Sequence, residues 1–207
     1  MSWLLTGGSG QLATTLAQLL DREGISFVAP PKSELDITQT SSVAKMIDLK
    51  PSLIVNCAAY TAVDKAESES EAAHSVNATG ARNVASAARE LKAQLIQIST
   101  DYVFSGESFT PWKVDSPTSP STQYGKSKLA GEEAIREIFQ LSGESTDRIT
   151  PVSSAEYVTP AKRPKFSVLD HSRWIEVGMS GLRSWGSALK DAYPSIRTQV
   201  ERELRNG

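Results

Sequence analysis

Near its start the chain reads Trp3-Leu4-Leu5-Thr6-Gly7-Gly8-Ser9-Gly10-Gln11-Leu12, and this sequence is the strongest indication of its fold. A short apolar run stops at a cluster of glycines. Leucines then recur at positions 12, 16, 19 and 20, the spacing of one face of a helix, and Gly24 is placed to end that helix. A strand, a glycine-rich turn and a helix in this order indicate a unit that binds a dinucleotide, because free N–H groups at the helix N-terminus face the pyrophosphate.

The alternation of strand and helix continues outward from this unit. The sequence predicts strands over 25–29, 53–55 and 95–98, with helices over 38–49 and 72–91 between them. Parallel strands need long crossovers, and helices supply them. We therefore predict an α/β fold with a Rossmann-like, doubly wound parallel sheet.

The pattern weakens in the last third of the chain. A helix is predicted over 124–139, and weaker helical patterns follow over 174–193 and 196–204. We expect two parts, a dinucleotide-binding domain over residues 1–140 and a C-terminal region over residues 141–207.

The composition is that of an ordinary globular protein. The 207 residues include 22 basic and 24 acidic side chains, and 39% are hydrophobic, so neither disorder nor nucleic-acid binding is indicated. No apolar run approaches the roughly 20 residues of a membrane span, and the start lacks the basic region of a signal peptide. We therefore expect a cytoplasmic protein without a membrane partner.

Cysteine and histidine are too few to build a disulfide framework or a metal site. Cys57 is the one cysteine, and His74 and His171 are far apart in the sequence. Cys57 lies in an apolar run, which predicts a buried and unreactive thiol.

A second group of residues follows the predicted strand over 95–98. Ser99 and Thr100 place hydroxyls at the carboxyl edge of the sheet, where open α/β folds bind ligands. Tyr124 and Lys128 are four residues apart and share a helix face. A nearby ammonium lowers the pKa of a phenol from about 10, and a lysine can also hold the nicotinamide ribose. Together these side chains favour reduction of a carbonyl by a nicotinamide cofactor.

The choice of cofactor depends on the residues after the second strand. An acidic residue there binds the ribose 2′-hydroxyl of NAD. Ala29-Pro30-Pro31 offers none, and Lys32-Ser33 suits a 2′-phosphate, so we expect NADP, with NAD left open. The alternative for Lys32 is an ordinary solvated side chain.

Five further stretches carry a resemblance, namely 35–38, 56–67, 99–104, 124–132 and 159–164. Together they are similar to the dTDP-4-dehydrorhamnose reductases, a family of extended short-chain dehydrogenase/reductases. The resemblance implies that NADPH or NADH reduces the C4 ketone of a dTDP-sugar, dTDP-4-dehydro-L-rhamnose, to give dTDP-L-rhamnose.

The resemblance also implies roles for individual residues. Tyr124 would donate a proton to the ketone, Lys128 would orient the nicotinamide ribose, Thr100 would bind the carbonyl and Asp101 would touch the sugar. Besides Tyr124 and Lys128, the residues implied to bind the cofactor are Gly7, Gly10, Gln11, Leu12, Asp36, Ile37, Ala58, Ala59, Tyr60 and Thr61.

The chain departs from the family after the predicted catalytic helix. The family has several dozen more residues there, so we expect 141–207 to be a shortened remnant of its sugar-nucleotide-binding region. Residues 138–143 resemble a later strand, which would end the helix near Glu137. The loss would also uncover an apolar edge of the sheet. Thr15 stands at an acidic position of the family's metal-linked dimer, so no metal is expected and a homo-oligomer is left open.

Two other classes of protein stay open. One is a non-catalytic NADP-binding protein resembling the regulatory subunit of methionine adenosyltransferase, which the shortened interior favours. The other is a sugar-nucleotide epimerase or dehydratase, which the stretch over 56–67 disfavours. The intact Thr100, Tyr124 and Lys128 favour a reductase.

Overall fold

The computed structural model describes residues 2–113, 115–140, 167–179, 181–184, 187, 188 and 191. The chain divides into two compact units, Met1–Leu169 and Asp170–Gly207. The predicted boundary after residue 140 falls at the start of the gap in the described residues, 141–166, and it stays a prediction.

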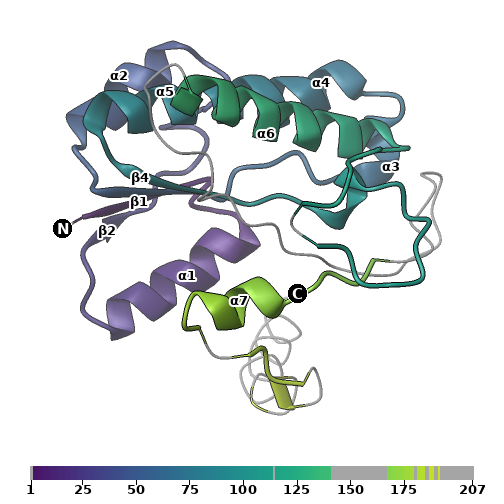
Figure 1. The fold of residues 1–207 in the computed structure, drawn as a ribbon. Helices are drawn as coiled ribbons and strands as arrows, with labels where there is room; N and C mark the ends of the chain where they lie inside the picture. The colour runs from purple at the N-terminus through teal and green to yellow at the C-terminus, as the bar shows by residue number, and fades with distance from the viewer. Residues whose placement is uncertain are drawn as a thin grey trace, which may run out of the picture. The chain divides into compact units, whose positions relative to one another are not determined.

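A parallel sheet forms the centre of the first unit (Figure 1). Its strands are β1 (Trp3–Thr6), β2 (Phe27–Val28), β3 (Leu53–Asn56) and β4 (Gln94–Gln97), in the order β2-β1-β3-β4. This topology confirms the predicted Rossmann-like sheet. β2 is shorter than predicted because Pro30 and Pro31, which follow it, have no N–H to continue the ladder.

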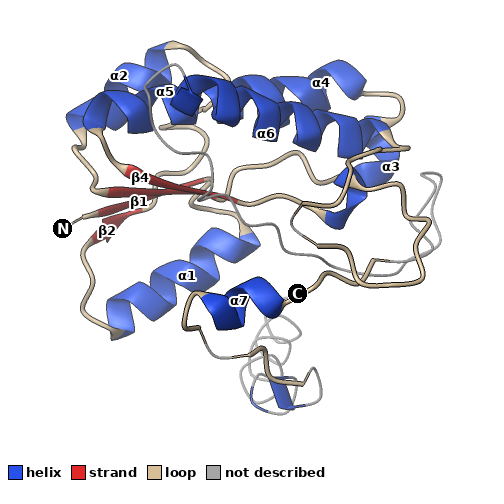
Figure 2. Cartoon of the chain, viewed as in Figure 1, coloured by secondary structure: helices blue, strands red, loops and turns tan. Residues whose placement is uncertain are grey.

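Helices cover both faces of the sheet (Figure 2). In the first unit they are α1 (Gln11–Arg22), α2 (Ser41–Asp48), α3 (Val63–Ala66), α4 (Ser70–His74), α5 (Ala81–Leu91) and α6 (Gln123–Gln140), with a π-helical turn η1 (Ser75–Gly80) and a 3₁₀ turn η2 (Asp101–Val103). Leu4 and Ile54 belong to the core beneath α2 and α5, whereas Leu5 and Val55 belong to the core beneath α1.

The predicted apolar face of α1 is partly wrong. Leu20 is buried and Leu16 packs against the core, but Leu12 and Leu19 are exposed. The buried stripe instead follows residues 13, 16, 17 and 20, because alanines at 13 and 17 let the helix lie close to the sheet.

The predicted helix over 72–91 consists of three consecutive segments, α4, η1 and α5. The π-helical turn widens the helix locally. It contains Asn77, whose side chain is 2% exposed although the surrounding sequence is rich in alanine.

Helix α6 extends beyond its expected end near Glu137. Ile138 is buried with Ile135 against Ala81 and Ala85 of α5, so the apolar stripe of the helix continues through this turn. The strand expected over 138–143 is therefore wrong for residues 138–140, and residues 141–143 lie outside the described residues.

Among the strands that the structure describes, β4 is the last one on its side of the sheet. Ile96 is in register with Val55, which places it on the α1 face, and 46% of its surface is exposed. Ile98 is exposed as well. The exposure of these two side chains agrees with the expected uncovered apolar edge, which stays a prediction because residues 141–166 lie outside the described part of the chain.

In the second unit, a helical pattern interrupted by Gly178, Gly181 and Gly186 was predicted over 174–193. The structure has α7 (Ser172–Glu176), which ends just before Gly178 with its φ of +79°, and residues 187, 188 and 191 are helical as well. The helix predicted over 196–204 falls outside the described residues. No helix in the described part of the chain is long and apolar enough to cross a membrane.

Candidate active site

The loop after β1 requires glycine. Gly7 has a φ of +65°, and a Cβ atom there would lie 2.9 Å from Cα of Ala58. A Cβ atom on Gly8 would lie 2.0 Å from the carbonyl oxygen of Ala29. The Gly8 N–H donates to the Pro30 carbonyl at 3.0 Å. The loop is thus wedged between the segments that follow β2 and β3.

The N-terminus of α1 is open to an anion. Gly10 caps the helix without a side-chain hydrogen bond, and the first turn has no acidic residue. Gln11 and Leu12 are exposed. The first N–H groups of a helix lack partners within it, so this end of α1 fits the pyrophosphate of a dinucleotide.

The loop after β3, which contains the predicted cofactor residues 58–61, is held by Asn77. Its amide oxygen accepts the Tyr60 N–H at 2.9 Å, and its amide nitrogen donates to the Tyr60 carbonyl at 3.1 Å. The same nitrogen lies 2.9 Å from the hydroxyl of Ser127 on α6. Sequence analysis missed Asn77. The available signal was one polar amide within an alanine-rich helix.

Thr100 and Tyr124 meet at the carboxyl edge of the sheet, as predicted. Their side chains are hydrogen-bonded. The Thr122 hydroxyl accepts the Gly125 N–H at 3.0 Å and caps the start of α6. A Cβ atom on Gly125 would lie 2.3 Å from the Tyr102 carbonyl oxygen, so glycine lets α6 begin directly against η2.

The pKa of Tyr124 is raised above its usual value of 10, not lowered as predicted. Burial is the main cause, the charges of Asp101 and Tyr102 add to it, and the hydrogen bond with Thr100 opposes it. The expected lowering by Lys128 fails because the lysine Nζ donates instead to the carbonyl oxygen of Ile98.

Lys128 itself is a buried cation, with only 4% of its surface exposed. Burial lowers its pKa to about 8, although the charge of Glu132 acts in the opposite direction. Tyr124 and Lys128 both lie buried on α6, one turn apart.

Asp101 is buried at the start of η2, where one of its carboxylate oxygens lies 3.2 Å from the Thr100 hydroxyl. That hydroxyl also accepts the Tyr102 N–H at 3.3 Å. The predicted sugar-contacting residue therefore lies beside the predicted carbonyl-binding residue.

A row of polar side chains crosses the carboxyl ends of the central strands. Thr6 is hydrogen-bonded to Asn56, whose amide nitrogen donates to Gln97 at 2.7 Å. The Gln97 amide donates to the Ile98 carbonyl at 2.9 Å, the oxygen that also accepts from Lys128. This row, which links β1 to the lysine, was not predicted.

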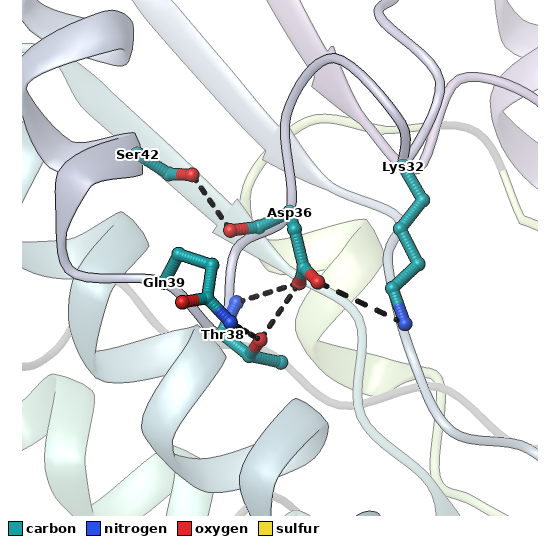
Figure 3. Close-up of polar contacts among 5 residues, drawn as sticks. All are labelled: Lys32, Asp36, Thr38, Gln39 and Ser42. Atoms are coloured by element: carbon teal, nitrogen blue, oxygen red, sulfur yellow. Dashed lines mark hydrogen bonds and ion pairs between the residues drawn. The ribbon is translucent and has the colours of Figure 1, made fainter.

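The segment around Asp36 is a local network (Figure 3). The Asp36 carboxylate accepts the Thr38 N–H at 3.0 Å and the Thr38 hydroxyl at 2.8 Å, and Lys32 Nζ lies 3.9 Å away. Burial alone would raise the pKa of Asp36, but the Thr38 hydrogen bonds and Lys32 outweigh it and hold the pKa below its usual value. Lys32 is exposed, and the side chain of Ile37 lies in the core.

Cys57 is partly buried against the core beneath α1, and burial raises its pKa to about 11. The thiol is only partly buried but stays protonated at neutral pH, which agrees with the predicted lack of reactivity. The described residues contain no group of three or more His, Cys, Asp or Glu side chains that could hold a metal ion.

Comparison with known proteins identifies relatives over almost the whole chain. The model of the family described as the RmlD substrate binding domain matches residues 1–142 and 136–198. The chain is 31% identical to a dTDP-4-dehydrorhamnose reductase of Streptomyces griseus, covering 94% of this chain and 93% of the relative. It is 28% identical to a dTDP-4-keto-6-deoxy-D-glucose reductase of Streptomyces niveus, covering 94% and 97%.

A solved structure shows the same architecture. The dTDP-4-dehydrorhamnose reductase of Bacillus anthracis, crystallised in complex with NADP, superposes with a TM-score of 0.81 at 26% identity, covering 94% of this chain and 99% of that one.

The relatives carry an interior that this chain lacks. The alignment with the Streptomyces griseus relative runs over 284 positions, although it includes only 94% of the 207 residues of this chain. The two family matches meet at 136–142, the end of α6 and the residues just after it. This agrees with the predicted internal shortening after the catalytic helix.

Proposed function

The chain belongs to the family of the RmlD substrate binding domain, and on this premise we propose that it is an NADP-dependent reductase of a dTDP-linked 4-keto sugar. Its proposed reaction is the reduction of dTDP-4-dehydro-L-rhamnose to dTDP-L-rhamnose, a step of dTDP-rhamnose biosynthesis. We further propose that it works in the cytoplasm.

One observation carries the proposal above all. Thr100, Tyr124 and Lys128 come from two segments of the chain and lie buried at the carboxyl edge of a parallel sheet. The same edge carries the glycine loop and the open end of α1, which fit a dinucleotide. This combination of side chains suits the reduction of a carbonyl.

Tyr124 is the proposed proton donor. Reduction of a ketone places negative charge on its oxygen, and a general acid must be protonated when the reaction begins. The raised pKa of Tyr124 keeps its phenol protonated at neutral pH. Thr100, hydrogen-bonded to Tyr124, would bind the same ketone oxygen, and Asp101 would contact the sugar.

The cofactor residues have complementary tasks. Gly7, Gly10, Gln11 and Leu12 would hold the pyrophosphate, and NADPH supplies the hydride when it is bound. Residues 58–61, fixed by Asn77, would line the dinucleotide with Asp36 and Ile37. Lys128 would hold the hydroxyls of the nicotinamide ribose.

Preference for NADP rests on Lys32. The complex of the Bacillus anthracis relative with NADP supports this choice. Lys32 lies near Asp36, but both the exposure of the lysine and the separation of 3.9 Å leave the ammonium able to turn toward a 2′-phosphate.

The shortened interior supports a second candidate, a protein that binds NADP without catalysis. One assay distinguishes the reductase from the binding protein. NADPH consumption is followed by absorbance with dTDP-4-dehydro-L-rhamnose as substrate, for the chain and for Tyr124→Phe. Turnover that falls about 10²- to 10⁴-fold in the variant supports the reductase. Tight NADPH binding without turnover in the unaltered chain supports the binding protein instead.

A further inference from the structure

Glu132 is a buried carboxylate on α6, one helical turn beyond Lys128, and only 6% of its surface is exposed. One of its oxygens accepts a hydrogen bond from the Ser99 hydroxyl, and the other lies 3.1 Å from the Arg136 guanidinium. Buried charges need partners of this kind. The reduction described above uses Lys128 but gives Glu132, Ser99 and Arg136 no role.

Burial disfavours the charged form of Lys128, and a nearby carboxylate such as Glu132 can offset this effect. Its Nζ donates to the carbonyl oxygen of Ile98, a neutral group, in a buried environment that favours the uncharged amine. Glu132 lies four residues further along α6 and is buried as well, and it binds Ser99, the neighbour of the residue whose carbonyl Lys128 binds. Its negative charge therefore lies close enough to favour the ammonium. A lysine that lost its proton near neutral pH would lose a donor and its positive field at the cofactor.

The neighbouring elements supply no other charge that raises the pKa of Lys128 among the described residues. The other titratable side chains of α6 are Tyr124, Lys126, Glu133, Arg136 and Glu137. Those of the elements packed against it are Asp64 and Lys65 of α3, Glu71 and His74 of α4, Arg82, Arg89 and Glu90 of α5, and Asp101 and Tyr102 of η2. Asp101 and Tyr102 act on Tyr124, and Arg82 pairs with Glu137 at 3.0 Å. Among the described charges, Glu132 is the one that raises the pKa of Lys128.

We propose that Glu132, held in place by Ser99 and Arg136, is a positioning residue that keeps Lys128 an ammonium at the carboxyl edge of the sheet. Its purpose, to let Lys128 hold the nicotinamide ribose, rests on the proposed function. The charge relation between the two side chains exists without the cofactor and is measured without it.

The test is a titration of Lys128 in the cofactor-free chain. Carbon-13 NMR follows the ε-carbon of the lysine, and the signal is assigned by its absence from Lys128→Met. Glu132→Gln removes the charge at nearly constant size, and Glu133→Gln removes a charge from the adjacent exposed position of α6. We expect Glu132→Gln to lower the midpoint by at least about one pH unit and Glu133→Gln to leave it nearly unchanged. Equal midpoints in the two variants overturn the proposal.

A second variant keeps the test decisive if Glu132→Gln does not fold. Arg136→Gln removes the cation beside Glu132, which leaves more of the carboxylate's field to Lys128, so the midpoint should rise. An unchanged or lower midpoint overturns the proposal.

Cofactor affinity gives an independent readout. NADPH binding to Glu132→Gln, followed by fluorescence, should weaken as the pH rises through the lowered midpoint of Lys128, at a lower pH than in Glu133→Gln. Identical pH profiles contradict the link to the cofactor. These measurements need no turnover, so a failure of the proposed reduction shows separately, as absent turnover in the unaltered chain.

Discussion

The two ends of the candidate site are built in different ways. The phosphate end is made of backbone from one short stretch, residues 7–12, shaped by glycine and by the start of α1. The catalytic end is made of side chains from η2, α6 and the end of β4, fixed by Asn77 and Glu132. Substitutions at the first end should therefore damage folding and cofactor binding together, whereas at the second end activity and stability can separate.

The largest difference between the effect on activity and the effect on stability is expected for Lys128→Met. Turnover should fall by at least about 10²-fold, because the cofactor loses a group that orients it. Stability should rise. Burial that lowers the lysine pKa from 10.5 to about 8 corresponds to about 3 kcal/mol at neutral pH, partly offset by the bond to Ile98. Urea unfolding at pH 7 should show that the free energy of unfolding rises by about 1 kcal/mol. A decrease would show that the buried ammonium does not destabilise the folded chain.

The same lysine predicts a pH dependence of stability. Its pKa is lower in the folded chain, so between about pH 8 and 10.5 the unfolded chain binds more protons. The stability of the unaltered chain should therefore rise across this range relative to Lys128→Met. Urea midpoints measured for both chains at several pH values check this. Parallel curves would show that Lys128 is not buried as a cation.

At the phosphate end, Gly8→Ala should lower stability and NADPH affinity together. The added Cβ atom would lie 2.0 Å from the Ala29 carbonyl oxygen, so the loop must move, at an expected cost of about 2 kcal/mol. Gly24→Ala is the control, since Gly24 has positive φ but open space around it and should cost about 1 kcal/mol without affecting NADPH. Unfolding and fluorescence titrations measure both effects. Unchanged NADPH affinity in Gly8→Ala would show that the shape of this loop does not determine cofactor binding.

Asn77→Ala tests the contact between the two ends. Removing the amide leaves the Tyr60 N–H and carbonyl without their partner in a partly buried loop, which should cost about 1 to 3 kcal/mol. NADPH affinity should fall as well, because the loop over 58–61 loses its support. Unfolding and binding curves that match the unaltered chain would show that Asn77 does not hold this loop.

The smallest effect is expected for Lys32→Ala. An exposed charge contributes up to about 1 kcal/mol, so the preference for NADPH over NADH should fall by no more than about fivefold. Dissociation constants for both cofactors measure this, with Lys45→Ala as an exposed control on α2. An unchanged preference for NADPH would show that Lys32 is an ordinary solvated side chain that does not bind the 2′-phosphate.

The comparison also explains which features the sequence could predict. The glycine loop, the strands and the spacing of Tyr124 and Lys128 are local patterns, and the structure contains them nearly as predicted. The direction of Lys128 toward Ile98 and the pairing of Ser99 with Glu132 each join residues 30 or more positions apart. Packing between distant segments decides such contacts, and no spacing rule encodes them.

The most direct test of the account follows the hydride itself. NADPH deuterated at the transferable position of the nicotinamide is incubated with dTDP-4-dehydro-L-rhamnose and the chain, and the product is analysed by NMR. If Tyr124 is the proton donor, the unaltered chain should give dTDP-L-rhamnose with deuterium at C4, and Tyr124→Phe should give almost none. A folded chain that binds NADPH but forms no deuterated product, or equal product from both chains, would contradict this mechanism.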